Sequence, residues 1–154
     1  MASNLPIYGE GFVLREVQAS DAHALAAIEF DPEVKRYLAV PSTPKDEWLQ
    51  KFDPALICGL AIVTSDGQIA GLASLTRVSR RFDREIRIVL GSQHQKRGLG
   101  TGVVKELLAL AFDKPFIRAI VAHVHPKNEG SLRLLRALRF RRRPQKVQNG
   151  KAAI

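Results

Sequence analysis

The stretch Gln95-Lys96-Arg97-Gly98-Leu99-Gly100-Thr101-Gly102 decides the fold. It follows an apolar alternation over residues 84–90, which predicts a strand, and precedes an amphipathic pattern over residues 100–112, which predicts a helix. Glycines in such a turn let the backbone approach a ligand closely. The free N–H groups and positive dipole end of the following helix bind phosphate, and Lys96 and Arg97 add charge. The sequence therefore predicts an anion-binding turn between a buried strand and a helix.

Spacing excludes two nucleotide-binding motifs at this turn. A P-loop requires lysine and then serine or threonine after its last glycine, but Val103 follows Gly102. The dinucleotide fingerprint requires a glycine where Val103 stands and an acidic residue about 20 residues further on, and neither is present. A glycine turn that only reverses the chain remains the alternative.

The segments on either side of the turn predict one mixed domain. Strands are expected over residues 12–17, 56–64, 68–78, 84–90 and 116–124, and helices over residues 22–30, 32–38, 44–52, 100–112 and 128–138. Phe140 is expected to begin a further strand, and Asn149-Gly150 to turn into a last strand ending at Ile154. The order β-α-α-β-β-β-α-β-α-β predicts an α/β or α+β fold in a single domain over residues 1–154, with a short basic end over residues 141–154.

Composition sets the broad class of the protein. The chain has 154 residues, of which 45% are hydrophobic, which is enough for a core and argues against disorder. The single cysteine, Cys58, excludes a disulfide framework and a cysteine-rich zinc site, and its apolar surroundings predict a buried, inert thiol. No apolar run approaches the roughly 20 residues of a membrane span, and no secretory signal pattern opens the chain. We expect a cytoplasmic protein that does not bind membranes.

Charge is divided unevenly along the chain. Residues 1–76 carry five basic and ten acidic side chains, whereas residues 77–154 carry nineteen basic and five acidic ones, for a net charge of +9 overall. After Glu129 no acidic residue occurs, while eight basic residues follow. The excess of positive charge in residues 77–154 favours an anionic partner. A solvated basic face is the alternative interpretation.

Three motifs carry a resemblance to a known family. The pattern Gln95-x-x-Gly98-x-Gly100 after an apolar strand resembles the acetyl-CoA signature of the GNAT N-acetyltransferases. Residues 31–38 are similar to the first helical region of the subgroup that contains the ribosomal-protein alanine N-acetyltransferases. The pattern Asn128-x-x-Ser131 within residues 128–140 resembles a helix of that subgroup. The motifs keep the family's order across about residues 10–141, and the resemblance implies a mixed central sheet that is splayed at the acetyl-CoA site.

The resemblance implies a set of cofactor-binding positions. In the family, the signature strand holds the pantetheine arm of acetyl-CoA with free backbone groups, and its amide near Leu90 faces the acetyl oxygen. Backbone N–H groups of the turn hold the pyrophosphate. Carried over, the cofactor-binding residues are Ile88, Val89, Leu90, Gln95, Lys96, Arg97, Gly98, Leu99, Gly100, Thr101, Asn128 and Ser131. No metal is expected, and two histidines, His123 and His125, are interpreted as ordinary residues of a sheet or site rim.

The resemblance also implies catalytic positions. Leu90 supplies its amide to the oxyanion, and Glu85 is the candidate general base, although a solvent-facing carboxylate paired with a neighbouring arginine explains it equally well. Ser131 is the candidate acid that protonates the CoA thiolate, with a plain surface serine as the alternative. Many family members use a tyrosine on this helix, where this chain has Leu135. Arg139 stands where the family has glycine, so the helix end is expected to differ.

Two function classes follow. The first is an acetyl-CoA-dependent N-acetyltransferase that acts on a primary amine of a protein N-terminus or a small molecule by direct attack in a ternary complex. Glu33 and Tyr37 are expected to line its acceptor site. The second is a nucleic-acid or ribosome-binding module that uses the basic end of the chain. A ribosome or protein partner through that end, and a monomer or homodimer, are compatible with the first.

Overall fold

The computed structural model describes residues 5–38, 43–78, 82–143 and 152–153. The strands are β1 (Ile7–Gly9), β2 (Phe12–Glu16), β3 (Leu60–Thr64), β4 (Ile69–Arg77), β5 (Asp83–Leu90), β6 (Ala119–Val121), β7 (His123–Val124) and β8 (Ala152–Ala153). The helices are α1 (Ala22–Glu29), α2 (Pro32–Lys35), α3 (Lys45–Gln50), α4 (Leu99–Phe112) and α5 (Glu129–Ala137), with short 3-10 turns at Ala19–Asp21, Pro54–Leu56 and Ser92–His94. The predicted mixed α/β fold class is confirmed.

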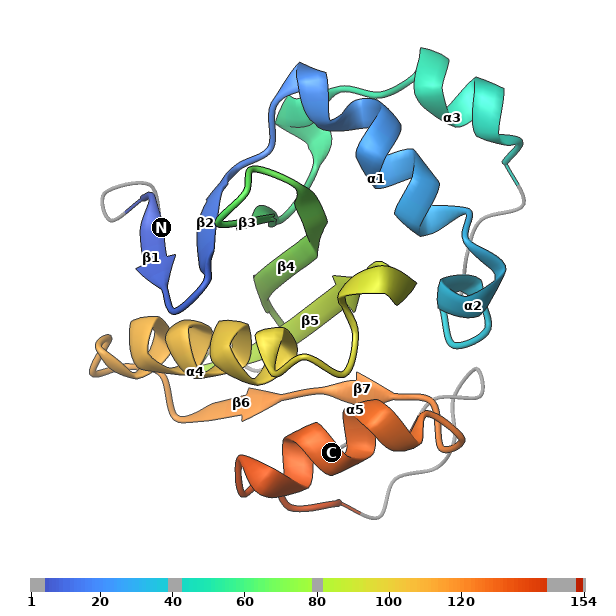
Figure 1. Cartoon of the computed structure of the whole chain (residues 1–154). Helices are drawn as coiled ribbons and strands as arrows, with labels where there is room; N and C mark the ends of the chain where they lie inside the picture. The colour runs from blue at the N-terminus through green and yellow to red at the C-terminus, as the bar shows by residue number, and fades with distance from the viewer. Residues whose placement is uncertain (1–4, 39–42, 79–81, 144–151, 154) are drawn as a thin grey trace.

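A six-stranded sheet forms the centre of the molecule, in the order β1-β2-β3-β4-β5-β6. The strands from β1 to β5 are antiparallel, and β6 is parallel to β5 because the chain returns through α4. The turn between β3 and β4 contains Gly67 at a φ of 85°, as the Asp66-Gly67 pair predicts. Figure 1 shows α1 and α3 at the top of the view, α2 below them at the right, and α5 at the bottom beside β6 and β7.

The sheet opens between β5 and the strand that follows α4. β4 pairs with β5 from Arg84 to Leu90, but β6 pairs with β5 only over Asp83–Glu85. β7 then departs from β5 and pairs with β8 instead. One edge of β5 between Ile86 and Leu90 therefore has no strand beside it in the described part of the chain. This is the splay that the resemblance implies.

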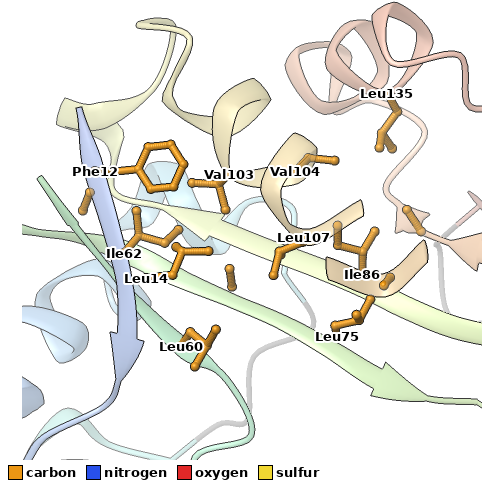
Figure 2. Packing of buried hydrophobic residues seen from close by; sticks show 14 of the residues in the cluster. Phe12, Leu14, Leu60, Ile62, Leu75, Ile86, Val103, Val104, Leu107 and Leu135 are labelled. Atoms are coloured by element: carbon orange, nitrogen blue, oxygen red, sulfur yellow. The ribbon is translucent and has the colours of Figure 1, made fainter. Parts of the chain in front are cut away.

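The core lies between the sheet and α4. Val103, Val104 and Leu107 of α4 are buried against the inward side chains of the strands, among them Leu14 and Ile62 (Figure 2). Full burial of an aliphatic side chain contributes roughly 1.5–3 kcal/mol. The other face of the sheet is covered by α1, whose Leu25 and Ile28 line a small cavity together with Leu72 of β4. Two layers of helices thus hold β5 from both faces and leave its free edge open. None of the helices in the described ranges is long and apolar enough to cross a bilayer.

Several predicted elements begin or divide at other residues. The strand predicted over residues 56–64 begins at Leu60, because Asp53 accepts a hydrogen bond from Ala55 N at 2.9 Å and starts a 3-10 turn. The strand predicted over residues 116–124 divides into β6 and β7 at Ala122, where the chain changes partners. β1 was not predicted, since three residues carry too little periodicity.

Three expectations near loops and ends are wrong. Phe140 begins no strand; it follows the end of α5 and packs against the core. Cys58 is exposed, because the segment before β3 lies on the surface and not in the sheet. The end of α5 does not depart from the left-handed geometry: Arg139 adopts a φ of 65°, and Phe140 N donates to Leu135 O at 2.9 Å. Arginine therefore takes the conformation that glycine usually supplies there. The predicted Asn149-Gly150 turn lies outside the described residues.

Candidate active site

A cavity of about 560 Å³ occupies the splay between β5 and β7. Its walls come from β5, the glycine turn, the start of α4, β7, α5 and the segment around α2. The predicted site residues that line it are Glu33, Tyr37, Glu85, Ile88, Val89, Leu90, Gln95, Lys96, Gly98, Gly100, Thr101, Asn128 and Ser131. Two predicted cofactor-binding residues do not line it: Arg97 is exposed outside the cavity, and Leu99 packs against the core. The fold thus brings together residues from opposite ends of the chain.

The free edge of β5 presents backbone groups to this cavity. Gly91 N donates to Ala70 O at 2.9 Å, so Gly91 faces β4. Because successive residues of a strand point their N–H and C=O groups to opposite edges, those of Leu90 and Ile88 face the open side and those of Val89 face β4. Gln95 Nε2 donates to Leu90 O at 3.0 Å from the open side, which agrees with this assignment. The Leu90 N–H is left directed into the splay.

Gly98 and Gly100 of the turn each require glycine, but for different physical reasons. Gly98 has a φ of 78° and precedes α4, a conformation that L side chains rarely adopt. Gly100 is packed so tightly that a Cβ there would lie 2.9 Å from Leu134 Cδ1 and 3.4 Å from Leu90 Cδ1. Lys96 also has a positive φ, of 60°, although it is not a glycine. The backbone is therefore held in an unusual shape where α4 begins, and the first N–H groups of that helix have no acceptor within it.

Gly71 of β4 fixes the position of the signature strand from behind. A Cβ at Gly71 would lie 1.9 Å from Val89 O and 3.0 Å from Val89 C. Both neighbours are backbone atoms, so a side chain at this position displaces β5 itself. The location of the free edge thus depends on a glycine that lies outside the signature.

The start of α5 forms another wall. Asn128 Oδ1 accepts a hydrogen bond from Ser131 N at 3.2 Å, so Asn128 caps the helix. Ser131 is half-buried and is one of the residues that line the cavity. Leu135, at the position where many members of the resembling family have tyrosine, is buried in the core and offers no proton donor. Among these residues, Ser131 is the hydroxyl that the helix presents to the cavity.

Glu85 contacts His123, a residue that the sequence analysis interpreted as an ordinary member of a sheet or site rim. His123 Nδ1 lies 3.0 Å from Glu85 Oε1, and both side chains are about one-third exposed, at 37% and 33% respectively. The two residues lie where the β5–β6 pairing ends, and both line the cavity. The expected alternative pairing of Glu85 with Arg84 or Arg87 has no counterpart among the ion pairs of the described residues. The two residues are 38 positions apart in the sequence, so no local pattern indicates the contact.

The remaining wall is formed by α2 and the end of β7. The Tyr37 ring packs against the His125 ring, with centroids 5.6 Å apart. Glu33 is exposed and paired with Arg36 at 2.9 Å. His125 is a second histidine that lines the cavity, in agreement with its interpretation as a residue of a sheet or site rim, and its alternation with His123 indicated a shared face.

Asp31 ties this wall to the loop after β5. Ser92 Oγ donates to Asp31 Oδ2 at 2.6 Å, and Glu33 N donates to Asp31 Oδ1 at 2.9 Å, which starts α2. These hydrogen bonds, chiefly that of Ser92, hold the pKa of Asp31 below its ordinary value. The carboxylate therefore stays ionised and links the two sides of the cavity. Within the described parts of the chain, no three His, Cys, Asp or Glu side chains come together as metal ligands would.

Comparison with known proteins agrees with this architecture. The family model described as "Acetyltransferase (GNAT) domain" matches residues 12–141. An N-acetyltransferase of Bacillus licheniformis, p20, is 27% identical over 146 residues, which covers 88% of this chain and 82% of that protein.

Solved structures share the fold across the chain. An acetyltransferase of the GNAT family from Bacillus anthracis superposes with a TM-score of 0.83 at 16% identity, covering 97% of this chain and 98% of that one. The ribosomal-protein-S5-alanine acetyltransferase from Vibrio fischeri has a TM-score of 0.75 at 20% identity, with 98% and 96% covered. Spermidine N-acetyltransferase from Vibrio cholerae, solved with CoA and spermine, has a TM-score of 0.74 at 16% identity, with 94% and 95% covered. At these identities the likeness extends to the fold alone.

Proposed function

The chain belongs to the GNAT acetyltransferase family and is an N-acetyltransferase, and we propose that it transfers the acetyl group of acetyl-CoA directly to a primary amine in a ternary complex. The observation that carries this proposal is the free edge of β5, whose Leu90 N–H is directed into the cavity beside the start of α4. A donor held there by the strand is preorganised for an oxyanion.

The residues that line the cavity suit acetyl-CoA in their charge and in their free backbone groups. The first N–H groups of α4, with Lys96 beside them, suit the pyrophosphate. The backbone of Ile88 and Leu90 suits the amide groups of the pantetheine arm, since an extended arm adds to a strand edge as another strand would. Val89 is expected to make no backbone hydrogen bond to the arm, because its N–H and C=O groups face β4.

The proposed reaction is an acyl transfer. The lone pair of the amine attacks the thioester carbon, a C–N bond forms, and the C–S bond breaks with its electron pair remaining on sulfur. The Leu90 N–H stabilises the negative charge on the acetyl oxygen. The amine proton is taken up at the pair formed by Glu85 and His123, where the Glu85 carboxylate supplies the negative charge, and Ser131 supplies a proton to the departing thiolate.

The acceptor is proposed to be a protein N-terminus or a small-molecule amine that enters beside α2. Glu85 gives that side of the cavity a negative charge, which attracts an ammonium group, and Glu33 lies there in an ion pair with Arg36. Tyr37 and His125 form an aromatic wall against which its carbon atoms can pack.

Calorimetry and a kinetic assay test the proposed function. We expect saturable binding of acetyl-CoA and release of CoA when a panel of peptides, amino acids, polyamines and aminoglycosides is added. A protein that binds no acetyl-CoA would overturn the proposal. Ser131→Ala is expected to lower kcat while acetyl-CoA still binds, and the matched control Ser65→Ala changes an exposed serine of the turn between β3 and β4, outside the cavity.

A second candidate function rests on the surface of α5 and the residues after it. Its arginines are all exposed and form no ion pair within the described residues: Arg133, Arg136, Arg139, Arg141, Arg142 and Arg143. A surface of one sign attracts a polyanion, so we infer that it is a candidate contact for RNA, including ribosomal RNA. Filter binding to single-stranded RNA at about 50 and 200 mM salt tests this, because phosphate contacts weaken steeply with salt. No binding at the lower salt concentration would exclude it.

A further inference from the structure

The contact between Glu85 and His123 has a chemical consequence beyond packing. An ionised carboxylate only accepts hydrogen bonds, so the imidazole nitrogen that faces Glu85 Oε1 at 3.0 Å must carry the proton. A neutral ring with its proton on Nδ1 has a lone pair on Nε2. The pairing with Glu85 therefore selects the tautomer of His123 in which Nε2 can take up a proton.

The second histidine of the cavity is held in the opposite tautomer. Lys127 N donates to His125 Nδ1 at 3.1 Å, so Nδ1 of His125 is the acceptor and its neutral ring carries the proton on Nε2. His125 thus has no free lone pair to offer the cavity. Of the two imidazoles that line the site, His123 is the one prepared to accept a proton.

An imidazole is also better matched than a carboxylate to this step. A proton acceptor works best when its pKa lies near the operating pH, and an ordinary imidazole titrates near 6.5 whereas an ordinary glutamate titrates near 4.3. A carboxylate behind the ring stabilises the imidazolium that forms.

We propose that Nε2 of His123 accepts the proton of the acceptor amine, with Glu85 as the positioning residue that holds Nδ1–H and stabilises the resulting imidazolium. This inference rests on the proposed function and deepens it, because it moves the proton from Glu85, the base that the family resemblance implies, to its partner on β7. The proton leaves the amine nitrogen for Nε2, and the electron pair of the former N–H bond stays on the nitrogen that is acylated. The imidazolium then releases the proton to solvent, since the ring is about one-third exposed.

Other charged groups surround the pair. The titratable side chains that line the cavity from the neighbouring elements are Glu33, Tyr37, Arg87, Lys96, His125 and Arg133. Among these residue types, only histidine ordinarily changes its charge near neutral pH. The pH dependence of the reaction must therefore be assigned with both histidines changed separately.

His123→Asn is the sharpest variant, because the asparagine amide nitrogen takes the place of Nδ1 and can still donate to Glu85 but cannot take up a proton. We expect kcat to fall about 100-fold or more and the ascending limb of the pH profile of kcat/KM to disappear, while acetyl-CoA binding is retained. His125→Asn is expected to keep that limb, whatever it does to KM. Adding Glu85→Gln to His123→Asn is expected to cost little more, because the two residues act as a unit. A His123→Asn enzyme that keeps the wild-type kcat and the ascending limb of the pH profile would overturn the assignment of His123 as the proton acceptor.

A measurement without turnover separates this inference from the proposed function. Nitrogen NMR of the wild-type protein at about pH 8 is expected to show His123 protonated on Nδ1 and His125 protonated on Nε2. The His123 pattern is expected to change in Glu85→Gln and to persist in the control Glu33→Gln. A His123 ring protonated on Nε2 would exclude the proposal even if the enzyme acetylates amines.

Discussion

At the scale of single residues, Arg139 holds a backbone conformation that glycine adopts without strain. Its φ is 65°, and its N–H donates to Arg136 O at 2.9 Å as the chain leaves α5. Left-handed backbone costs a non-glycine residue about 1 kcal/mol. We predict that Arg139→Gly raises the free energy of unfolding by about 1 kcal/mol and Tm by roughly 2–4 °C, measured by urea and thermal unfolding.

Arg136→Gly is the matched control for this prediction. It removes the same exposed side chain from inside α5, where glycine lowers stability by about 1 kcal/mol relative to a good helix former. The two glycine variants are therefore expected to shift Tm in opposite directions. If Arg139→Gly also lowered Tm, the left-handed strain would not be the deciding effect there.

Asp21 is the buried carboxylate that anchors the start of α1. It is 3% exposed and receives two hydrogen bonds from the Arg15 guanidinium, at 2.7 and 2.9 Å, and one from Gln18 N at 2.8 Å. The hydrogen bonds from Arg15, ahead of the opposing effect of burial, hold the pKa of Asp21 below its ordinary value of 3.8. We predict that Asp21→Asn lowers the free energy of unfolding by roughly 2 kcal/mol at pH 7.

The pH dependence of this loss follows from the lowered pKa of Asp21. The carboxylate stabilises the fold fully above its unfolded pKa, and this contribution is lost as pH falls through the lower folded pKa. The stability gap between wild type and Asp21→Asn should therefore be constant at neutral pH and close as pH falls from about 5 toward 2. Asp113→Asn, at an exposed site, should show no such gap. A gap that widened in acid would contradict the assignment.

At the scale of elements, the position of β5 depends on Gly71 of β4. A Cβ at Gly71 would meet Val89 O at 1.9 Å, which is far inside van der Waals contact with backbone that cannot rotate away. We predict that Gly71→Ala lowers the free energy of unfolding by about 1–3 kcal/mol and weakens acetyl-CoA binding, since the free edge of β5 must shift. Thermal unfolding and calorimetry measure the two effects.

Gly130→Ala serves as the control for the stability part of this prediction. Its Cβ meets only Asn128 Oδ1, at 3.8 Å, and it lies within α5, where alanine is the better helix former. It is expected to leave Tm unchanged or to raise it. An equal loss of stability in Gly71→Ala and Gly130→Ala would show that a methyl group at Gly71 destabilises the fold no more than one at an open position.

Local patterns predicted most elements because each has its own periodicity or cap. The helix at residues 100–112 and the strand at residues 84–90 were predicted within a residue or two of α4 and β5. The predictions that failed concern segments whose structure depends on pairing with distant parts of the chain. β6 and β7 are separate because one pairs with β5 and the other with β8, and no local pattern encodes that exchange.

The site shows the same division. The glycine motif indicated that Gly98 belongs to the site, and its φ of 78° is the physical reason why glycine stands at this position. The family resemblance indicated Glu85, which lines the cavity. His123 was given no catalytic role and was interpreted as an ordinary residue of a sheet or site rim, although it contacts Glu85. A contact across 38 residues requires the register of β5 against β6, which the sequence does not state.

At the scale of the whole molecule, the uneven charge of the chain is divided between two places. Lys96 lies in the cavity wall at the glycine turn, whereas Arg97 is exposed outside the cavity. Arg133 lines the cavity from α5, and the arginines at 141–143 lie beyond the helix on the exposed surface. A few residues of the basic half therefore line the cavity, where they are available to an anionic ligand, and most of the excess positive charge faces solvent, where it is available to a larger polyanion.

The central claim is that the free edge of β5 holds acetyl-CoA, and residue-resolved amide hydrogen exchange tests it most directly. In the free protein we predict fast exchange at Leu90 N–H, which faces the splay, and slow exchange at Val89 N–H, which faces β4. Saturating acetyl-CoA should slow exchange at Leu90 and leave Val89 as it was. Unchanged exchange at Leu90 with the ligand bound would contradict the account.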